Sequence, residues 1–441
     1  MVRQIYLTDR FFILWGAVIA LCAFSFAYAQ LYVFSLVVLG VILLLSLYEI
    51  FVLFAKQKPV DTQRFLPHLL SLGDDNKISL NIENHTGWKL FISLVDELPF
   101  QFQIRNFLLN FEIPPYEKKH LSYMQRPLMR GNYVFGAANL YISTFLGLIQ
   151  RRVACEANQV TAVYPSIIQM KKYEIRSMPK ISNFYGVKKM RRIGHSYEFE
   201  TIKNYVQGDD FRSINWKATG RRNSLMVNQY EDEKSQQIYS VLDKSRSMQL
   251  CFNGLTLLDY SINTSLVIAN NVLQKQDKAG LITFSNKIDT TVKADKGTTQ
   301  LKRILESLYK EEESNLEADY ELLFLALKHV VTSRSLLFLY SNFESFYSLQ
   351  RVLPVLRKIN QMHLLVVMFF ENTEVKNFGR EEPVNMKDMY AKTFAEEFVY
   401  EKQMIQQELK RYGIMSILSK PEDLSINTVN KYLEIKAKGL I

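Results

Sequence analysis

The chain has 441 residues, more than one compact hydrophobic core usually holds, so two or three domains are expected. Apolar residues make up 48% and charged residues 22%, which excludes a largely disordered protein, and the net charge of +10 suits nucleic acid, anionic lipid or an acidic protein as partner. The three cysteines lie far apart without paired spacing, so neither a disulfide framework nor a zinc knuckle is indicated.

Two apolar runs near the N-terminus predict a transmembrane helical hairpin over residues 1–56. The first covers residues 11–29, and the second covers residues 31–55 with Glu49 as its one charged residue. Each run is long enough to cross about 30 Å of hydrocarbon at about 1.5 Å per residue. A cleaved signal peptide is the alternative for the first run, although this run is longer than the apolar part of such peptides.

Flanking charges predict the orientation of the hairpin. Arg3 and Arg10 precede the first run, Lys56, Lys58 and Arg64 follow the second, and the loop between them has no Lys or Arg. Because positive flanks stay on the cytoplasmic side, we expect a two-pass protein of the cell (inner) membrane with both termini in the cytoplasm. The lipid bilayer is thus the first expected partner.

Residues 57–168 predict an antiparallel β-sandwich of the immunoglobulin-like kind. Short alternating or apolar runs occur at residues 77–82, 89–95, 107–113 and 132–135, with turn residues between them. No catalytic constellation occurs among them, so a spacer, a rigid support or a docking surface is expected.

Residues 169–235 predict a basic linker. It contains four basic pairs, namely Lys171-Lys172, Lys188-Lys189, Arg191-Arg192 and Arg221-Arg222. A solvated surface is the simplest interpretation, and contact with anionic lipid headgroups or an acidic protein face is the functional alternative. Nucleic acid is not expected as a partner, because no recognised binding motif accompanies the charge.

A dense polar stretch lies inside this linker and contains Gly208, Asp209, Asp210, Arg212 and Trp216. Glycine, two carboxylates and an arginine suggest a tight turn held by ion pairs, with the tryptophan as an apolar plug. An acid/base pair of the two aspartates is the alternative, for which the sequence offers no partnered nucleophile or metal. The role of this stretch stays open.

Residues 236–441 predict an α/β domain with a doubly wound parallel sheet. Continuous apolar runs at residues 238–242, 336–340 and 364–370 are typical of strands buried on both faces. Helical periodicity, as in residues 258–273, separates the strands, so helices should cover both faces of the sheet. A functional site is expected at the carboxyl ends of the strands.

The first strand of this domain ends in a DxSxS sequence that presents Asp243, Ser245 and Ser247. Carboxylate and hydroxyl oxygens are hard ligands that suit Mg²⁺ or Mn²⁺. A DxSxS at the end of the first strand of such a domain resembles the metal-ion-dependent adhesion site of von Willebrand factor A (vWA) and integrin-type domains. Such a site performs no chemistry, because a carboxylate of a partner protein fills its open coordination position.

The resemblance to the vWA site implies ligands from two further loops. A threonine of the second loop corresponds to Thr298 or Thr299, and we take Thr298 as the ligand. The third loop usually carries an aspartate, and this chain has Asn342 there, so a charge is lost and weaker metal binding is expected. Glu344 compensates only if its side chain points inward.

Several motifs together resemble the bacterial domain of unknown function 58 family over nearly the whole chain. Residues 205–218, YVQGDDFRSINWKA, are similar to the family's Y-x-x-G-D-x-x-R-x-I-x-W-x-A signature. Residues 130–133 (RGNY), 146–148 (LGL) and 163–165 (VYP) are similar to three further pieces, with Leu146 where the family has Phe. The resemblance implies a membrane hairpin, a β-rich segment and a vWA-like domain, and many members are encoded near MoxR-type AAA+ ATPases.

We therefore expect a membrane-tethered adaptor rather than an enzyme. It would face the cytoplasm and bind a MoxR-type AAA+ ATPase or its client through the metal site. A structural envelope component with a vestigial site is one alternative, favoured by Asn342. A metal-dependent hydrolase, with Asp243 on the metal and Asp209 or Asp210 as the base, is another, although the chain has no Walker A, GxSxG or Cys/His pair.

Overall fold

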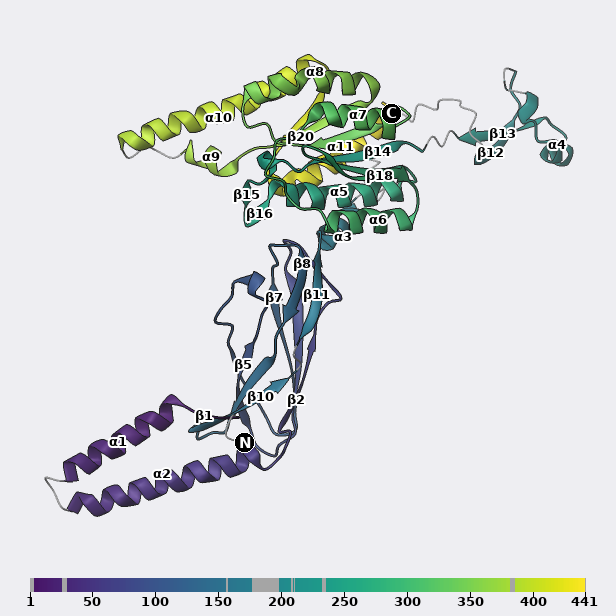
Figure 1. Ribbon diagram of the computed structural model, residues 1–441. Helices are drawn as coiled ribbons and strands as arrows, with labels where there is room; N and C mark the ends of the chain where they lie inside the picture. The colour runs from purple at the N-terminus through teal and green to yellow at the C-terminus, as the bar shows by residue number, and fades with distance from the viewer. Residues whose placement is uncertain are drawn as a thin grey trace. The chain divides into compact units, whose positions relative to one another are not determined.

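The computed structural model describes residues 4–25, 30–155, 158–176, 198–207, 209, 211–231, 235–380 and 385–440. The chain divides into two compact units, Met1–Ile168 and Gln169–Ile441 (Figure 1). Helices and several β-sheets occur together, so the prediction of a multi-domain chain of mixed α/β structure is confirmed.

The first unit begins with two helices, α1 (Asp9–Ser25) and α2 (Gln30–Phe54), which lie side by side. Within α2, the 23 residues Tyr32–Phe54 are long and apolar enough to cross a membrane. They span roughly 35 Å at about 1.5 Å per residue. The described part of α1 has 17 residues, and a second crossing stays a prediction.

Three sheets make up the rest of the first unit, with one strand, β1, before α1 and the others after α2. The sheet of five strands has the order β1 (Ile5–Leu7), β10 (Ile149–Cys155), β9 (Ala138–Ser143), β5 (Leu90–Asp96) and β6 (Leu109–Ile113). The other two contain β2 (Val60–Phe65), β4 (Asn76–Asn84) and β7 (Lys118–Gln125), and β3 (Leu69–Ser71), β11 (Gln159–Tyr164) and β8 (Gly131–Phe135). All described pairings in these sheets are antiparallel except that of β3 with β11.

Alternation of apolar side chains explains how the sheets share a core. Every second residue of β4 and β5 is buried, because neighbouring side chains of a strand point to opposite faces. Leu80 and Ile82 of β4 meet Leu90, Ile92 and Leu94 of β5 in one hydrophobic cluster. The short alternating runs of the sequence therefore form strands with one buried face.

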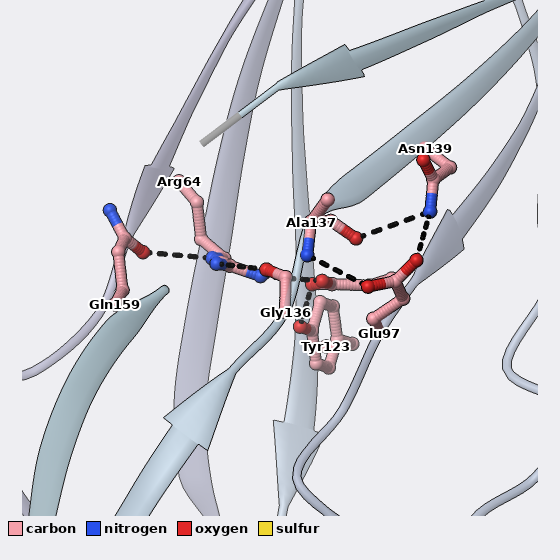
Figure 2. Close-up of polar contacts among 8 residues, drawn as sticks. Arg64, Glu97, Tyr123, Gly136, Ala137, Asn139 and Gln159 are labelled. Atoms are coloured by element: carbon pink, nitrogen blue, oxygen red, sulfur yellow. Dashed lines mark hydrogen bonds and ion pairs between the residues drawn. The ribbon is translucent and has the colours of Figure 1, made fainter. Parts of the chain in front are cut away.

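A buried polar network crosses the strand domain (Figure 2). The Arg64 guanidinium lies 2.6 Å from the Asp96 carboxylate, and both side chains are fully buried. Arg64 also donates to Gln159 Oε1 and to the carbonyl of Gly136, both at 2.8 Å, and the Tyr123 hydroxyl donates to Asp96. Burial raises the pKa of Asp96, against the opposing charge of Arg64. Because these residues come from all three sheets, the network fixes the sheets to one another.

The carboxylate of Glu49 joins α2 to the strand domain. Its side chain is buried, with 1% exposed, although it sits near the end of an apolar helix. It accepts hydrogen bonds from Thr144 Oγ1 at 2.6 Å and from the amides of Gly147, Leu148 and Ile149 at 3.0, 2.9 and 3.0 Å. Four donors of one loop thus compensate a charge that is removed from water.

Arg151 of β10 binds the end of the same helix. Its guanidinium donates to the carbonyls of Leu53, Lys56 and Gln57 at 2.7, 2.8 and 2.7 Å. It also lies 4.5 Å from the centre of the Phe54 ring. The last carbonyls of a helix have no partner inside the helix, so Arg151 supplies the cap that α2 needs.

The loop that holds Glu49 also contacts the segment before α1. Thr8 Oγ1 donates to the carbonyls of Gly147 and Leu148 at 2.7 and 3.0 Å. Gly147 has a φ of +64°, and a Cβ on it would lie 3.2 Å from the Arg10 guanidinium. Glycine is therefore required where the loop passes between the ends of the two helices.

The second unit contains a six-stranded sheet. Its order is β18 (Ile288–Asp295), β17 (Lys278–Phe284), β14 (Gln237–Asp243), β19 (Leu336–Tyr340), β20 (Leu364–Phe370) and β21 (Met415–Ser419). Strand β18 is antiparallel to β17, and the other neighbours are parallel. A short hairpin of β15 (Cys251–Phe252) and β16 (Leu255–Thr256) follows β14.

Helices cover both faces of this sheet (Figure 1). One group is α7 (Tyr320–Val330), α8 (Phe346–Met362) and α10 (Met386–Arg411), which packs on alternate residues such as Tyr239, Val241 and Leu337. The other group is α5 (Leu257–Gln274), α6 (Thr298–Tyr309) and α11 (Leu424–Ala437). Helix α9 (Thr373–Phe378) lies against α10.

The described part of the predicted linker has structure of its own. Helix α3 (Ile167–Arg176) follows β11, and β12 (Glu198–Asn204) pairs antiparallel with β13 (Met226–Glu231). The short helix α4 (Trp216–Arg222) lies between β12 and β13 in the chain. Two of the four basic pairs, Lys188-Lys189 and Arg191-Arg192, lie outside the described residues.

Replacing Glu49 with alanine removes the acceptor that four buried donors share. We expect the variant to lose roughly 3 kcal/mol of stability, since a hydrogen bond to a charged group contributes about 1.5–3 kcal/mol. Thermal unfolding of the full chain in detergent, followed by limited proteolysis of the strand domain, measures the loss. Glu117→Ala is the matched control, because Glu117 is exposed. Equal melting of both variants and the parent chain would contradict the role of Glu49.

Candidate functional site

Asp243 lies at the carboxyl end of the parallel sheet, as the DxSxS pattern predicts. It is the last residue of β14 and stands beside Phe284, the last residue of β17. Its side chain is buried, with 1% exposed. The loop that follows β14 carries Ser245 and Ser247, so one strand end positions all three oxygen-bearing side chains.

Neutral donors surround the Asp243 carboxylate. Oδ1 accepts from the amide of Ser245 at 2.8 Å. Oδ2 accepts from Ser341 Oγ at 2.7 Å and from the Tyr320 hydroxyl at 3.4 Å, and these two hydroxyls lie 2.7 Å apart. Burial raises the pKa of Asp243, while the hydrogen bonds from Ser245, Ser341 and Tyr320 lower it. Ser341 comes from the end of β19 and Tyr320 from the start of α7.

The two predicted hydroxyl ligands converge, and the third loop reaches them. Ser245 Oγ and Ser247 Oγ lie 3.1 Å apart. The amide nitrogen of Asn342 donates to the carbonyl of Ser247 at 3.1 Å. The structure therefore brings together Asp243, Ser245, Ser247 and Asn342, four of the five residues assigned to the metal. Glu344, two residues further along, is exposed.

The structure does not bring Thr298 to Asp243. Strand β18 runs antiparallel to β17, so its last residue, Asp295, pairs with Ala279 at the amino end of the sheet. Asp243 is level with Phe284. Phe284 and Ala279 are five residues apart on β17, so the two ends of the sheet are separated by roughly 17 Å. Thr298 begins α6 directly beyond Asp295. The sequence pattern does not show to which end of the sheet this segment returns the chain. The hydroxyl of Tyr320, from the start of α7, contacts Asp243 instead.

A buried lysine, Lys402, contacts the third loop and was not predicted. Its side chain on α10 is 3% exposed. Its ammonium donates to Asn342 Oδ1 at 3.1 Å and to the carbonyl of Phe343. Burial lowers the pKa of Lys402 to about 8, and the charges of Glu344 and Glu401 act in the opposite direction. No local motif marks this residue, because its partners are distant in the sequence.

The lysine next to Asp243 does not compensate its charge. Lys244 forms ion pairs with Glu311 at 2.7 Å and with Asp289 at 3.1 Å. Although burial acts against its charge, these two carboxylates raise the pKa of Lys244. The positive charge of Lys244 is therefore already matched by two negative charges.

The donor set at this edge of the sheet fits Mg²⁺ or Mn²⁺ only in part. Asp243, Ser245 and Ser247 supply one carboxylate and two hydroxyls, and Mg²⁺ usually keeps several waters besides one or two carboxylates. Asn342 has its carbonyl oxygen on Lys402, so it can contribute little. Within the described ranges no group of three or more His, Cys, Asp or Glu side chains could hold a metal, so a cation here would depend on hydroxyls and water.

The signature stretch is described in part, since Gly208 and Asp210 lie outside the described residues. Asp209 accepts from Lys203 Nζ at 2.8 Å and from the amide of Val206 at 3.0 Å. The hydrogen bond from Lys203 lowers the pKa of Asp209. Asp209 thus holds a turn by an ion pair, as the sequence suggested for this stretch.

The prediction that Trp216 is an apolar plug is wrong for the described residues. Its side chain is 71% exposed. Trp216 is the first residue of α4, and Arg212, also exposed, lies in the single turn Phe211–Ser213 before it. A signature tryptophan suggests a core position by its size, and sequence alone does not show that this small segment has no core to receive it.

Comparison with known proteins supports the family resemblance without adding a function. The family profile described as "Protein of unknown function DUF58" matches residues 201–388. "Uncharacterized protein YeaD" of Bacillus subtilis (strain 168) is 23% identical over 167 residues. That match covers 38% of this chain and 39% of the relative, so the chain is aligned with about two fifths of the relative's length.

Solved structures share only limited likeness with the chain. The crystal structure of the conserved hypothetical protein BatB from Bacteroides thetaiotaomicron is 11% identical, with a TM-score of 0.30, and covers 46% of this chain and 99% of its own. The CARDB domain of PF1109 from Pyrococcus furiosus is 12% identical, with a TM-score of 0.16, and covers 22% and 93%. TM-scores this low establish no shared fold.

The low pKa of Lys402 predicts a specific pH dependence of stability. Since burial lowers its pKa from 10.5 to about 8, the unfolded chain binds the proton more tightly than the folded chain. The stability that comes from the neutral amine is complete above pH 10.5 and is lost as the pH falls to 8. We expect the full chain to gain at most about 1.4 kcal/mol per pH unit in this window relative to Lys402→Met.

Denaturant midpoints between pH 7 and pH 10 measure this difference. Lys410→Met is the control, because Lys410 lies on the same helix with an exposed side chain. A stability difference between the parent chain and Lys402→Met that stays constant across the window would contradict the assignment.

Proposed function

We propose that the chain is a membrane-tethered adaptor that binds a protein partner at the carboxyl ends of the parallel strands of its α/β domain, where Asp243 lies. We call this end of the sheet the Asp243 edge. The observation that carries the proposal is the burial of the Asp243 carboxylate. Among the described residues, every group that donates a hydrogen bond to this carboxylate is neutral. A buried charge without a counter-charge is costly. A divalent cation at this position would supply the counter-charge and a coordination position for a partner's Asp or Glu.

We infer that this domain is vWA-like. The parallel sheet, the helices on both faces and the DxSxS after β14 support the inference. In this proposal Asp243, Ser245 and Ser247 hold Mg²⁺ or Mn²⁺, and Asn342 acts at most through a water molecule. The metal orients a carboxylate of the partner and supplies no reaction, so the chain is not proposed as an enzyme. The strand domain is proposed as an immunoglobulin-like sandwich, because its sheets have alternating buried side chains that share one core.

A MoxR-type AAA+ ATPase or its client is the proposed partner. The support is the resemblance to the domain of unknown function 58 family, which matches residues 201–388. The membrane tether is α2, and α1 is proposed as a second crossing that leaves both termini in the cytoplasm. The basic residues on both flanks of the hairpin support this orientation.

A structural envelope component with a vestigial metal site is the second candidate. Two contacts favour it. The Lys402 ammonium occupies the carbonyl oxygen of Asn342, and the hydroxyls of Tyr320 and Ser341 occupy one oxygen of Asp243. In this candidate the neutral donors and the lysine hold the loops without a cation.

Capture of a purified MoxR-type ATPase by the full chain in detergent tests the adaptor function. We expect Mg²⁺ to support binding and a chelator to weaken it at least tenfold, which corresponds to about 1.4 kcal/mol. Asp243→Asn and Ser247→Ala should each weaken binding as much as the chelator does. Thr298→Ala should bind like the parent chain, because Thr298 lies at the other end of the sheet. Binding that ignores Mg²⁺ and both variants would exclude this edge as the contact surface.

Thermal unfolding with and without Mg²⁺ separates the two candidates. A cation that binds only the folded chain stabilises it by about 2.7 kcal/mol at one hundred times its dissociation constant. We expect Mg²⁺ to stabilise the parent chain and Thr298→Ala in this way, and we expect it to have no such effect on Ser247→Ala. No gain at millimolar Mg²⁺ would favour the vestigial site.

A further inference from the structure

The segment from β12 to β13 is too small to bury its own apolar side chains. It consists of two paired strands and the short helix α4. Among its described side chains, only those of Met226 and Val227 are buried, each with 3% exposed. Two-stranded sheets are marginally stable without further packing. A surface outside the segment should therefore cover the apolar side chains that remain exposed.

Five large apolar side chains of this segment are exposed. One is Ile202 of β12, which is 38% exposed, and the other four lie within residues 206–225. Phe211 and Trp216 are each 71% exposed, Val206 is 62% exposed and Leu225 is 46% exposed. Single exposed apolar residues are ordinary, but four within twenty residues of chain suggest a contact surface.

Basic side chains accompany three of these residues, Phe211, Trp216 and Leu225, whereas two aspartates, Asp209 and Asp210, lie between Val206 and Phe211 in the chain. Residues 211–225 contain four Lys or Arg and no Asp or Glu. Lys217, Arg221 and Arg222 are exposed. Asp209, the nearest described carboxylate before this stretch, is paired with Lys203. We call the exposed set the aromatic–basic patch, and it comprises Val206, Phe211, Trp216, Lys217, Arg221, Arg222 and Leu225.

Local hydrogen bonds hold the backbone of α4 against β13. The Asn215 side chain caps α4 by accepting from the amide of Ala218 at 3.0 Å and donates to Asn228 Oδ1 of β13 at 2.8 Å. Thr219 Oγ1 accepts from the amide of Met226 at 3.0 Å. Helix α4 is therefore fastened to β13. Its residues Lys217 and Arg221 are four apart and lie on one side of the helix.

We propose that the aromatic–basic patch docks on the surface of an anionic lipid bilayer. Tryptophan is favoured at the depth of the lipid headgroups, where its ring meets both apolar and polar surroundings. Each Lys or Arg near an anionic membrane contributes about 1 kcal/mol. The docking rests on the proposed membrane tether, because α2 keeps the patch at high effective concentration near the bilayer.

Charge complementarity favours lipid phosphate over an acidic protein as the occupant. The basic side chains of the patch are long and exposed, and they lie on the same short helix as the exposed Trp216. Such side chains match a fluid layer of phosphates, which imposes no fixed positions on them. A specific protein partner would be recognised by groups held in fixed positions, which the solvated side chains of Lys217, Arg221 and Arg222 do not offer.

Fluorescence of Trp216 in nanodiscs tests the docking on the full chain. The chain has three tryptophans, and Trp15→Phe with Trp88→Phe leaves Trp216 as the single reporter. We expect a blue-shifted emission and quenching by brominated lipids in discs of phosphatidylcholine with phosphatidylglycerol. In discs of phosphatidylcholine alone, or at high salt, both effects should be several-fold smaller, because salt screens the attraction.

Charge-reversal variants show whether the basic residues cause the effect. Lys217→Glu with Arg221→Glu and Arg222→Glu should abolish the quenching. The control variant is Lys302→Glu with Arg303→Glu and Lys310→Glu. It changes the net charge by the same amount at exposed positions of α6 and its C-cap, and it should leave the quenching intact. Equal quenching in neutral and anionic discs, or in the first triple variant, would overturn the proposal.

Tryptic cleavage of the unmodified chain gives a second measurement. Cleavage after Lys217, Arg221 and Arg222 should be several-fold slower in anionic discs than in neutral discs. Equal rates in both discs, with the chain still in the membrane after carbonate extraction, would overturn the docking and leave the tether intact. Release of the chain by carbonate would overturn the tether and the docking together. Protection of Trp216 only by an added acidic protein would overturn the lipid as occupant.

Discussion

A single buried carboxylate, that of Glu49, fixes how the strand domain begins. An apolar helix that ends in a buried charge must find donors at once, because water is not available to the side chain. Three consecutive amides and one hydroxyl supply them. This geometry requires the loop around Gly147 to pass between the ends of α1 and α2, and Arg151 caps α2 from the adjoining strand. The helices and the strand domain are thus joined by contacts that leave the junction little freedom.

The same physical constraint, applied to other buried carboxylates, distinguishes structure from a candidate site. Asp96 has the Arg64 guanidinium 2.6 Å away, so its charge is matched inside the fold. Glu49 has three backbone amides and a hydroxyl aimed at it. Asp243 accepts from one backbone amide and two hydroxyls, and within the described part of the chain it has no cationic partner. The least compensated of these three carboxylates lies at the carboxyl end of a parallel sheet, where ligands commonly bind.

Local patterns in the sequence predicted the features that depend on neighbouring residues. Apolar runs predicted α2 and the buried strands, and the DxSxS spacing placed Asp243, Ser245 and Ser247 together. Thr298 could not be placed in this way, because its position depends on the antiparallel direction of β18. Lys402 could not be found either, since it reaches Asn342 from a helix far along the chain. The exposure of Trp216 depends on how little apolar surface its segment can bury, which spacing does not reveal.

The pairing of Asn342 with Lys402 changes the electrostatics expected of a vWA-like site. An aspartate in the third loop would add a second negative charge beside Asp243 and so strengthen the hold on a divalent cation. Here the amide adds no charge, and the ammonium on its oxygen adds a positive one. A cation at this edge would consequently be held less tightly, but the loaded edge would carry a larger positive charge. A carboxylate of a partner protein would then meet a stronger attraction, so that weaker metal binding and tighter partner binding would follow from the same substitution.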